Sequence, residues 1–331
     1  MTGDREARGD GGEGTVAVLA GGVGAARLLT GLQLVVDAAR LTAIVNVGDD
    51  TQLHGLLICP DLDTITYTLS GANDAERGWG LAGETWRAMA ALERFADVRP
   101  AGSGAGATWF SLGDQDLATH LYRTHRLAEG ATLTTVTGEI TRAYGVGPRV
   151  LPVTDDPVRT MLAVAGEGEL GFQEYFVGHR HEVPITGVRF DGAATARPTG
   201  DVVRAIEGAE TLVIAPSNPI VSIGPLLAVP GVGDLVRGRR ATTVAVSPIV
   251  GGRALKGPAD RMLAELGHDV SVTGVARLYR DLAAVLVIDQ VDAELAGEVE
   301  AEGVRCVVTD TVMTTPAVAA VLAETLLGAV P

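Results

Sequence analysis

The spacing of apolar and polar residues predicts an α/β fold. Thr15–Ala20 is a short, continuous run of apolar residues, as found in the buried centre of a parallel sheet. A glycine turn follows, and Ala25–Ala39 then carries apolar residues at the spacing of one helix face. Leu41–Val47 has the pattern of a second buried strand. A strand, a glycine turn, a helix and a strand form the opening of a nucleotide-binding βαβ unit.

The same alternation returns in the second half of the chain. Strands are predicted at Thr211–Ala215, Ala241–Val246, Ala284–Ile288 and Cys306–Thr309. Helices are predicted at Val202–Ile206, Ile223–Val229, Pro258–Leu266 and Ala317–Leu327. The pattern therefore predicts a doubly wound, mostly parallel, Rossmann-like sheet.

Between these two halves, residues 84–145 predict a helical insertion or subdomain. Its helices are expected at Glu84–Phe95, Asp114–Leu127 and Thr132–Tyr144. Short strands are expected after it, at Val150–Val153 and Thr160–Val164. Residues 1–14 are polar, charged and rich in glycine, so they predict a disordered tail. Residues 15–331 are then a single Rossmann-like domain that carries the insertion.

The charge balance narrows the classes of function. The formal net charge is −15, which argues against unaided binding to nucleic acid or to an anionic membrane. No apolar run approaches the roughly 18 residues that a membrane span needs. The two cysteines, Cys59 and Cys306, lie far apart and form no C-x-x-C pair. These features predict a reduced, cytoplasmic protein without nucleic-acid or membrane partners.

The stretch from residue 46 to residue 67 is acidic and free of basic residues. Its carboxylates form two pairs in turn-forming sequence: Asp49, Asp50, Asp61 and Asp63. No Lys or Arg occurs between Arg40 and Arg77. Paired oxygen ligands of this kind suit a hard divalent cation such as Mg²⁺. The alternatives are that both pairs are solvated turns, or that Asp63 caps a helix beginning near Thr64.

The glycine turn after the first strand is a candidate phosphate site. Gly21, Gly22 and Gly24 come just before a helix, so backbone N–H groups and the helix dipole there can receive an anion. A dinucleotide-binding pattern would place glycine or alanine where this chain has Arg27. A nicotinamide dehydrogenase is therefore a poor match. A tight strand–helix turn without any ligand is the simpler alternative.

Other predicted strand ends carry polar residues in loops fixed by proline or glycine. The candidates for nucleotide or phosphate contacts are Ser217, Asn218, Pro219, Ser247, Gly251 and Lys256. Ser and Asn are also ordinary helix caps, and Lys256, the only lysine in the chain, also suits a solvated surface. In a doubly wound sheet these loops converge on one cleft with the acidic stretch. Phosphate-binding groups beside carboxylates favour phosphoryl or nucleotidyl transfer.

Six segments resemble one known family, in the same order. They read LAGGVGAARLLTGL, NVGDDTQLHGLLICPDLDTITYTL, RGWGLAGETW, WFSLGDQDLATHL, IAPSNPIVSIGPLL and SPIVGGRALKGPADRM. Nearly the whole chain from Thr15 onward resembles the CofD/FbiA family. The resemblance implies a late step of coenzyme F(420) biosynthesis. In that step a guanosine diphosphate-linked three-carbon acid donates its phospho-acid to the ribityl hydroxyl of a deazariboflavin, and GMP leaves.

The resemblance also implies roles for particular residues. A Mg²⁺ cofactor would be held by Asp49, Asp50, Asp61 and Asp63. Asp50, together with Asp49, would be catalytic and lie near the acceptor hydroxyl. The deazaflavin would contact Asp50, Trp79, Ala82 and Thr85. The guanosine and diphosphate end of the donor would contact Gly21, Gly22, Gly24, Ser217, Asn218, Pro219, Ser247, Gly251 and Lys256.

The resemblance leaves several questions open. Relatives often have a basic residue at the position of Ala82, so a cationic contact here would come from Arg77 or Arg87. The donor acid is phosphoenolpyruvate or 2-phospholactate, and the motifs resemble the actinobacterial branch, which is associated with the enolpyruvyl donor. The expected partners are small molecules, with a homodimer as an option. A non-catalytic regulator that binds a nucleotide-sugar is the main alternative function.

Overall fold

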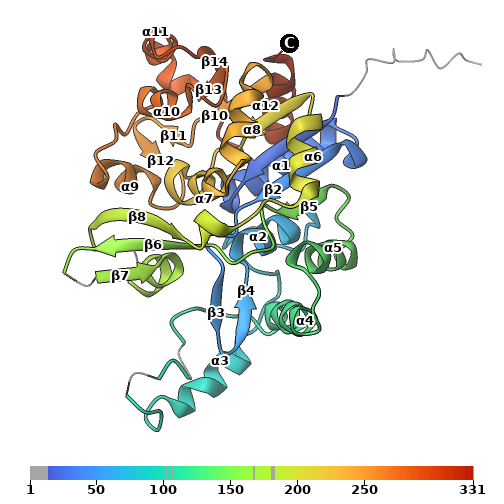
Figure 1. The fold of residues 1–331 in the computed structure, drawn as a ribbon, viewed down its shortest axis with the longest axis vertical. Helices are drawn as coiled ribbons and strands as arrows, with labels where there is room; N and C mark the ends of the chain where they lie inside the picture. Colours follow the sequence, from blue (N-terminus) through green and yellow to red (C-terminus); the bar gives the residue numbers. More distant parts are fainter. Residues whose placement is uncertain (1–13, 102, 106–107, 167, 180–182, 331) are drawn as a thin grey trace, which may run out of the picture.

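The centre of the molecule is a parallel sheet, as predicted. The computed structural model describes residues 14–101, 103–105, 108–166, 168–179 and 183–330, so the predicted tail lies outside it apart from Gly14. Seven strands run parallel in the order β14-β13-β10-β9-β1-β2-β5 (Figure 1). They are β1 (Val16–Ala20), β2 (Leu41–Val45), β5 (Arg149–Pro152), β9 (Thr211–Ile214), β10 (Thr243–Val246), β13 (Val285–Asp289) and β14 (Arg305–Thr309).

The order of the strands explains where a ligand site can form. The chain places β2 and β5 on one side of β1, and then crosses to the other side to build β9, β10, β13 and β14. The direction of winding therefore reverses between β1 and β9, which pair from Val16 opposite Thr211 onward. In open sheets of this kind, the loops that leave the two central strands diverge and leave a crevice at their carboxyl ends.

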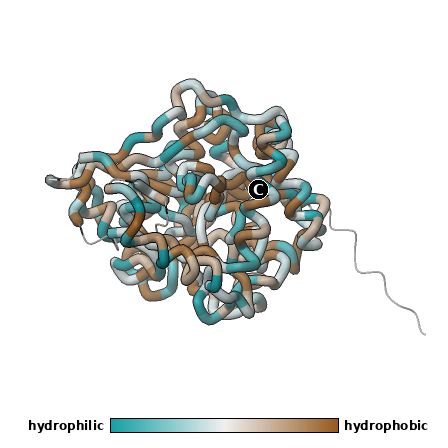
Figure 2. Tube along the Cα trace, turned by 90° about the horizontal axis from the view of Figure 1, so that it is seen from below, coloured by the Kyte–Doolittle hydropathy of each residue, from teal (hydrophilic) through white to brown (hydrophobic). Residues whose placement is uncertain are grey.

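Helices flank the sheet on both faces. They are α1 (Gly22–Val35), α2 (Pro60–Leu69), α6 (Gly200–Gly208), α7 (Gly224–Ala228), α8 (Val232–Gly238), α9 (Ala259–Glu265), α10 (Val272–Tyr279), α11 (Ala296–Ala301) and α12 (Pro316–Gly328). Every residue of β1, β2, β9, β10 and β13 is buried, because both faces are covered. Figure 2 shows hydrophobic stretches running through the interior of the trace.

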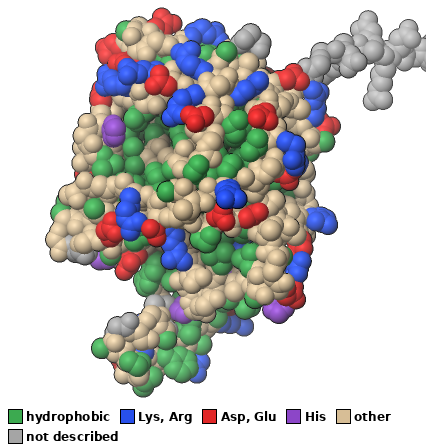
Figure 3. Space-filling view, in the orientation of Figure 1, with side chains coloured by type: hydrophobic (Ala, Val, Ile, Leu, Met, Phe, Trp, Pro, Cys, Tyr) green, Lys and Arg blue, Asp and Glu red, His purple; other side chains and the backbone are tan. Residues whose placement is uncertain are grey.

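The chain between β2 and β5 builds a separate, projecting part. It holds the hairpin β3 (Thr51–Leu53) and β4 (Leu56–Ile58), followed by α3 (Arg87–Leu92), α4 (Asp116–Ala128) and α5 (Leu133–Ala143). These last three helices fall within the range expected for the insertion, and Thr132 caps α5 as expected. Figure 1 shows the hairpin and α3 extending away from the main sheet, and Figure 3 shows hydrophobic side chains gathered on this projecting lobe.

A second, smaller sheet was not predicted from the sequence. It is antiparallel, with β6 (Arg159–Val164) between β7 (Gly168–Gly171) and β8 (Ile185–Asp191). A short pair, β11 (Ile249–Val250) and β12 (Arg253–Ala254), lies elsewhere. Short 3₁₀ segments occur at Ala38–Arg40, Glu93–Phe95, Ala193–Thr195, Arg240–Thr242 and Gln290–Leu295. The expected strand at residues 160–164 is thus present, and it belongs to the small sheet.

Two helices begin earlier than predicted, for local reasons. α1 starts directly after β1 because Gly22 has a φ of 71°, a value that glycine adopts readily. α2 starts at Pro60 rather than near Thr64, because proline suits the first helical position. Asp61 and Asp63 therefore lie within the first turn of α2. The alternative in which Asp63 caps a helix beginning near Thr64 is wrong.

The helix predicted at residues 223–229 is shorter than expected, and a turn of π-helix precedes it. A π-helical turn, Pro219–Ile223, precedes α7. The Asn218 side chain accepts hydrogen bonds from the N–H groups of Ile220 and Val221, at 2.9 and 3.4 Å.

Among the described residues, no single helix is long and apolar enough to cross a membrane. Pro219–Ala228 and Val232–Gly238 reach that length and hydropathy only as a pair, and the pair is bent by 99°.

Candidate active site

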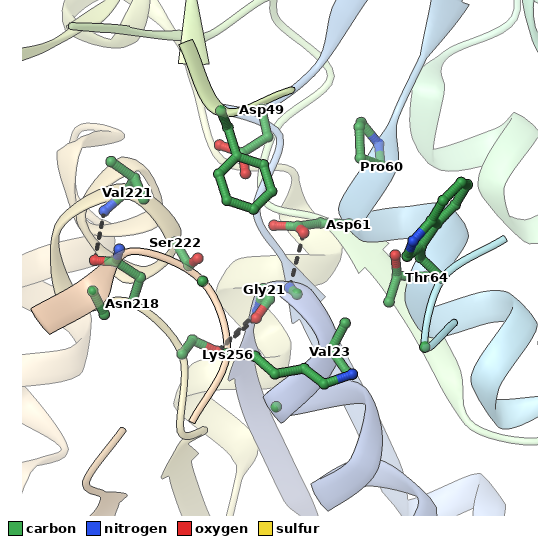
Figure 4. Close-up of a pocket in the computed structure, with 18 of the residues that line it drawn as sticks. Gly21, Val23, Asp49, Pro60, Asp61, Thr64, Asn218, Val221, Ser222 and Lys256 are labelled. Carbon is green, nitrogen blue, oxygen red and sulfur yellow. Dashed lines mark hydrogen bonds between the residues drawn. The ribbon is translucent and has the colours of Figure 1, made fainter. Parts of the chain in front are cut away.

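A cavity of about 620 Å³ opens where the winding direction of the sheet reverses. Most residues predicted for the site line it: Gly21, Gly22, Gly24, Asp49, Asp61, Asp63, Trp79, Ser217, Asn218, Ser247 and Lys256. Other predicted site residues lie outside its lining: Asp50, Ala82, Thr85, Pro219 and Gly251. In Figure 4, Asp61 lies beside Gly21 and Asp49 lies beyond it, while Asn218 and Ser222 lie on the opposite side from Pro60 and Thr64.

The loops after β1 and β9 are joined directly to each other. The Ser217 hydroxyl donates to the carbonyl of Gly21 at 2.8 Å and accepts from the N–H of Gly21 at 3.3 Å. A Cβ atom at Gly24 would lie 2.3 Å from the carbonyl oxygen of Pro216, so only glycine fits there. The two central strand ends are therefore held together by backbone contact, and this contact forms the floor of the cavity.

Asp61 links the glycine turn to the acidic stretch. One carboxylate oxygen accepts from the N–H of Gly22 at 2.8 Å (Figure 4), and the other accepts from the Asn46 amide at 2.9 Å. The Asn46 side chain in turn accepts from the N–H of Gly48 at 2.8 Å. Burial raises the pKa of Asp61 to about 6, and these hydrogen bonds only partly offset that shift.

Asp49 is buried and Asp50 is half-buried, and within the described part of the chain no basic side chain forms an ion pair with either carboxylate, although the charge of Arg123 partly offsets the rise in the pKa of Asp50. Burial raises the pKa of both, and the neighbouring Asp61 raises that of Asp49 further. The Cys59 thiol donates to one oxygen of Asp50 at 3.1 Å. Within the described part of the chain, one oxygen of each carboxylate has no hydrogen-bond partner. Each of these unpartnered oxygens is a possible ligand for a hard divalent cation, although the three ligand atoms that lie within 4.8 Å of one another among the described residues are those of Asp63, Asp116 and His120.

Asp63 has a different environment, although it belongs to the same acidic stretch. It forms a short ion pair with Arg123, a side chain that is only 1% exposed. His120 lies 3.7 Å from Asp63 and 3.2 Å from Asp116, so it bridges the two carboxylates. The Tyr67 hydroxyl donates to Asp116 at 2.6 Å. Ligand atoms of Asp63, Asp116 and His120 lie close enough to share a metal, but the buried Arg123 already supplies their positive charge.

The partners of Asp63 were missed in the sequence, although a signal exists. Asp116, His120 and Arg123 follow one another at helical spacing, so they lie on one face of α4. Thr119 and these same His and Arg residues are the buried ones in that helix. A run of buried ionisable residues along one helix face indicates a charge network rather than a solvated surface.

Basic side chains offset the charge of the cavity. Arg27, Arg77 and Lys256 all line it, and of these the sequence indicated only Lys256 as a phosphate contact. Burial, and then the charge of Arg27, lower the pKa of Lys256. The Arg77 guanidinium lies 5.2 Å from the ring centre of Trp79 and 4.8 Å from that of Trp86. A cation therefore does reach the cavity near Trp79, from Arg77 rather than from the position of Ala82.

Comparisons with known proteins agree with this architecture. A family model described as 2-phospho-L-lactate transferase CofD matches residues 16–327. A phosphoenolpyruvate transferase of Streptomyces griseus is 42% identical over 295 residues, covering 88% of this chain and 90% of that protein. A phosphoenolpyruvate transferase of Kitasatospora aureofaciens is 40% identical over 318 residues, covering 95% of this chain and 97% of that protein.

The fold is also found among solved structures. A crystal structure of a UPF0052 family member from Bacillus halodurans superposes with a TM-score of 0.59 and 18% identity. The superposition covers 95% of this chain and 99% of that chain, so it supports the overall α/β fold. Because the family model spans nearly every element from β1 to α12, and the relatives share about two residues in five, the chain belongs to the CofD family.

Proposed function

We propose that this protein is a transferase of coenzyme F(420) biosynthesis. It moves the phosphoenolpyruvyl group, or the 2-phospho-L-lactyl group, from a guanosine diphosphate-linked donor to the ribityl hydroxyl of a deazariboflavin. The acceptor oxygen forms a bond to the phosphorus that bears the acid. The bond from this phosphorus to GMP breaks, GMP leaves and the hydroxyl proton is lost. The more general statement, that the protein is a transferase of the CofD family, is supported by the family match and by the names of the relatives.

One observation carries the proposal: the cavity brings together the groups that this transfer needs. The N–H groups of Gly21 and Gly22 already bond Ser217 and Asp61, so the diphosphate would be received by the N–H groups that follow in the first turn of α1, from Val23 onward. Arg27 and Lys256 add positive charge beside it. Asp49 lies at the same cavity with an oxygen that has no partner among the described residues. Phosphoryl transfer depends mainly on positioning and on charge neutralisation, and these residues serve both.

We assign the residues as follows. Ser217 and Gly21 set the floor on which the diphosphate rests, and Asn218 and Ser247 lie beside it. Asp49 and Asp50 would hold Mg²⁺, which when bound neutralises charge on the phosphoryl oxygens. The contact of Asp61 with the N–H of Gly22 fixes the position of the acidic stretch against the glycine turn. Trp79 and Arg77 line the part of the cavity that we assign to the deazaflavin.

The proposal also covers the donor acid, the cellular location and the oligomeric state. The relatives of Streptomyces, Nocardia and Kitasatospora are all named phosphoenolpyruvate transferase, so we favour the enolpyruvyl donor. Cys59 and Cys306 are both free thiols, which suits the reducing cytoplasm that we propose as the location. A homodimer is compatible with the proposal, and light scattering of the purified protein would establish its mass.

The direct test is mass analysis of the reaction products. Purified protein is incubated with the deazariboflavin, Mg²⁺ and either the enolpyruvyl or the lactyl donor linked to guanosine diphosphate. We expect GMP and a product that carries the enolpyruvyl phosphate, with less or no product from the lactyl donor. Omission of Mg²⁺ should abolish the reaction. Absence of product with both donors would contradict the proposed function, and activity without any divalent cation would contradict the metal assignment.

A further inference from the structure

One wall of the cavity comes from the small antiparallel sheet and has no role in the assignments above. The segment between β7 and β8 contributes Phe172, Gln173, Phe176 and Val177 to the lining. None of these side chains carries a charge, although the rest of the lining holds several ionic groups. An uncharged wall suits the neutral, ring-bearing part of a ligand rather than its phosphates.

Two of these residues present aromatic surface to the cavity. The rings of Phe172 and Phe176 are stacked, with centroids 5.5 Å apart and planes inclined by only 6°. Phe172 is buried, whereas Phe176 is partly exposed. A stacked pair of rings at a cavity wall offers a flat apolar surface to another flat ring.

Gln173 lies between these two phenylalanines in sequence and is the polar group of the wall. It is only 7% exposed and lines the cavity. Its amide makes no hydrogen bond to any other residue in the part of the chain that the structure describes. Its amide atoms are not among the fully buried polar atoms without a partner in the described part of the chain, so they remain open to the cavity. An amide so placed is ready to pair with a ligand.

The wall is held rigidly against the rest of the site. The N–H of Thr160, in β6, donates to the carbonyl of Gly48 at 2.7 Å, beside the acidic stretch. Phe172 also packs in one buried cluster with Val221 and Met262. The Asn218 amide in turn contacts the sulfur of Met262 at 3.5 Å. The wall is therefore preorganised next to the loops that form the cavity, as a recognition surface needs to be.

We infer that Gln173, Phe172 and Phe176 form a subsite for a planar heterocycle that carries a lactam edge. A glutamine amide offers one C=O acceptor beside one N–H donor, which pairs with a neighbouring ring N–H and C=O. The phenylalanine pair stacks against the ring that bears this edge. The inference rests on the proposed function for the identity of the ligand, since both guanine and the pyrimidinedione ring of the deazaflavin carry a lactam edge.

The first test removes the amide without changing its size. The affinities of GDP and of the deazariboflavin are measured separately by calorimetry, for the wild-type protein and for Gln173→Met. We expect the affinity for one of the two ligands to fall about tenfold, the value of a paired hydrogen bond in a buried site. The affinity for the other ligand should stay within twofold. The melting temperature should not fall, because the amide has no partner to lose.

The second test removes the stacking surface. Phe176→Leu should weaken binding of the same ligand about fivefold or more. Phe190→Leu is the matched control, since Phe190 lies in β8 of the same small sheet but does not line the cavity. This control should leave both affinities unchanged, which separates loss of the ring surface from a general loosening of the sheet.

The ligand that responds identifies what the subsite binds. Selective weakening of GDP assigns it to guanine, and selective weakening of the deazariboflavin assigns it to the acceptor ring. Unchanged affinities in both variants, or equal weakening of both ligands, would overturn the inference and leave the proposed function standing. Wild-type protein that binds neither ligand would contradict the proposed function, and the inference would fall with it.

Discussion

Asp49 and Asp63 belong to the same acidic stretch, yet their surroundings differ. Asp49, with Asp50 and Asp61, forms an uncompensated cluster in which burial raises the pKa of every member. Asp63, with Asp116, forms a compensated cluster whose positive charge comes from Arg123, next to His120. Four carboxylates that look alike in sequence thus divide into three that form no ion pair within the described residues and one, Asp63, that is paired with a buried arginine. A buried acid acquires its role from its partners.

The largest effect is expected from breaking the compensated cluster. Arg123→Met leaves Asp63 buried without its cation, and should lower the free energy of unfolding by about 3–5 kcal/mol. Denaturant unfolding followed by circular dichroism measures this. Arg126→Met is the matched control on the same helix, because the ion pairs of Arg126 are partly exposed to solvent, and the loss of stability should be far smaller. Equal losses in the two variants would show that Asp63 does not depend on Arg123.

The uncompensated cluster should respond in activity rather than stability. Asp49→Asn and Asp50→Asn should each lower kcat on the order of 100-fold or more, since the charge that attracts the cation is lost. Neither variant should melt at a much lower temperature, because one oxygen of each carboxylate has no partner to lose among the described residues, and Asp50 loses only its contact with Cys59. The control is Asp234→Asn, at an exposed position far from the cavity lining. Full activity in both cluster variants would refute their role.

The raised pKa values in the uncompensated cluster should make the protein less stable as the pH rises. The pKa of Asp61 in the folded protein is about 6, above its ordinary value of 3.8, so the folded state holds the proton more tightly. The stability from this group is present in acid and is lost as the pH rises through 6. In Asp61→Asn, the free energy of unfolding should fall by about 1–3 kcal/mol less over this pH range than in the wild-type protein. Melting curves from pH 4 to pH 7.5 measure it, and an unchanged slope would contradict the shift.

The smallest change in stability is expected for Asp116, and its pH dependence runs in the opposite direction to that of Asp61. Although burial acts to raise its pKa, the hydrogen bond and charge of His120 outweigh burial and lower it. The stability from Asp116 is therefore present at neutral pH and is lost as the pH falls through its folded pKa. Asp116→Asn should cost about 1 kcal/mol near neutral pH and less in acid. A cost that grows in acid would place Asp116 with the uncompensated cluster instead.

The fold followed from sequence because its signals are local. Continuous apolar runs such as Val16–Ala20 mark strands buried on both faces, and the glycine turn marks the first strand–helix crossing. The small antiparallel sheet has no such pattern: β7 is two glycines, a glutamate and a leucine, and β8 is only partly buried. Its strands are stabilised by pairing with β6, which is a long-range property.

The site was predictable where it depends on strand ends, and not where it depends on tertiary partners. Gly21, Ser217 and Lys256 were found because strand–loop–helix junctions in such a sheet share one edge. The ion pair between Asp63 and Arg123 joins residues far apart in sequence, and short-range spacing does not reveal it. The lining role of Gln173 depends equally on the small sheet, which the sequence did not predict.

The contact between Gly24 and Pro216 has a consequence for the evolution of substrate choice. At this contact backbone lies against backbone, so the side chain at position 24 cannot be enlarged to change the shape of the cavity. Any change at position 24 would spread the two central loops and move both halves of the sheet. Changes that alter the shape of the cavity are therefore expected along its walls rather than at this contact, and engineering for other ligands should begin with those walls.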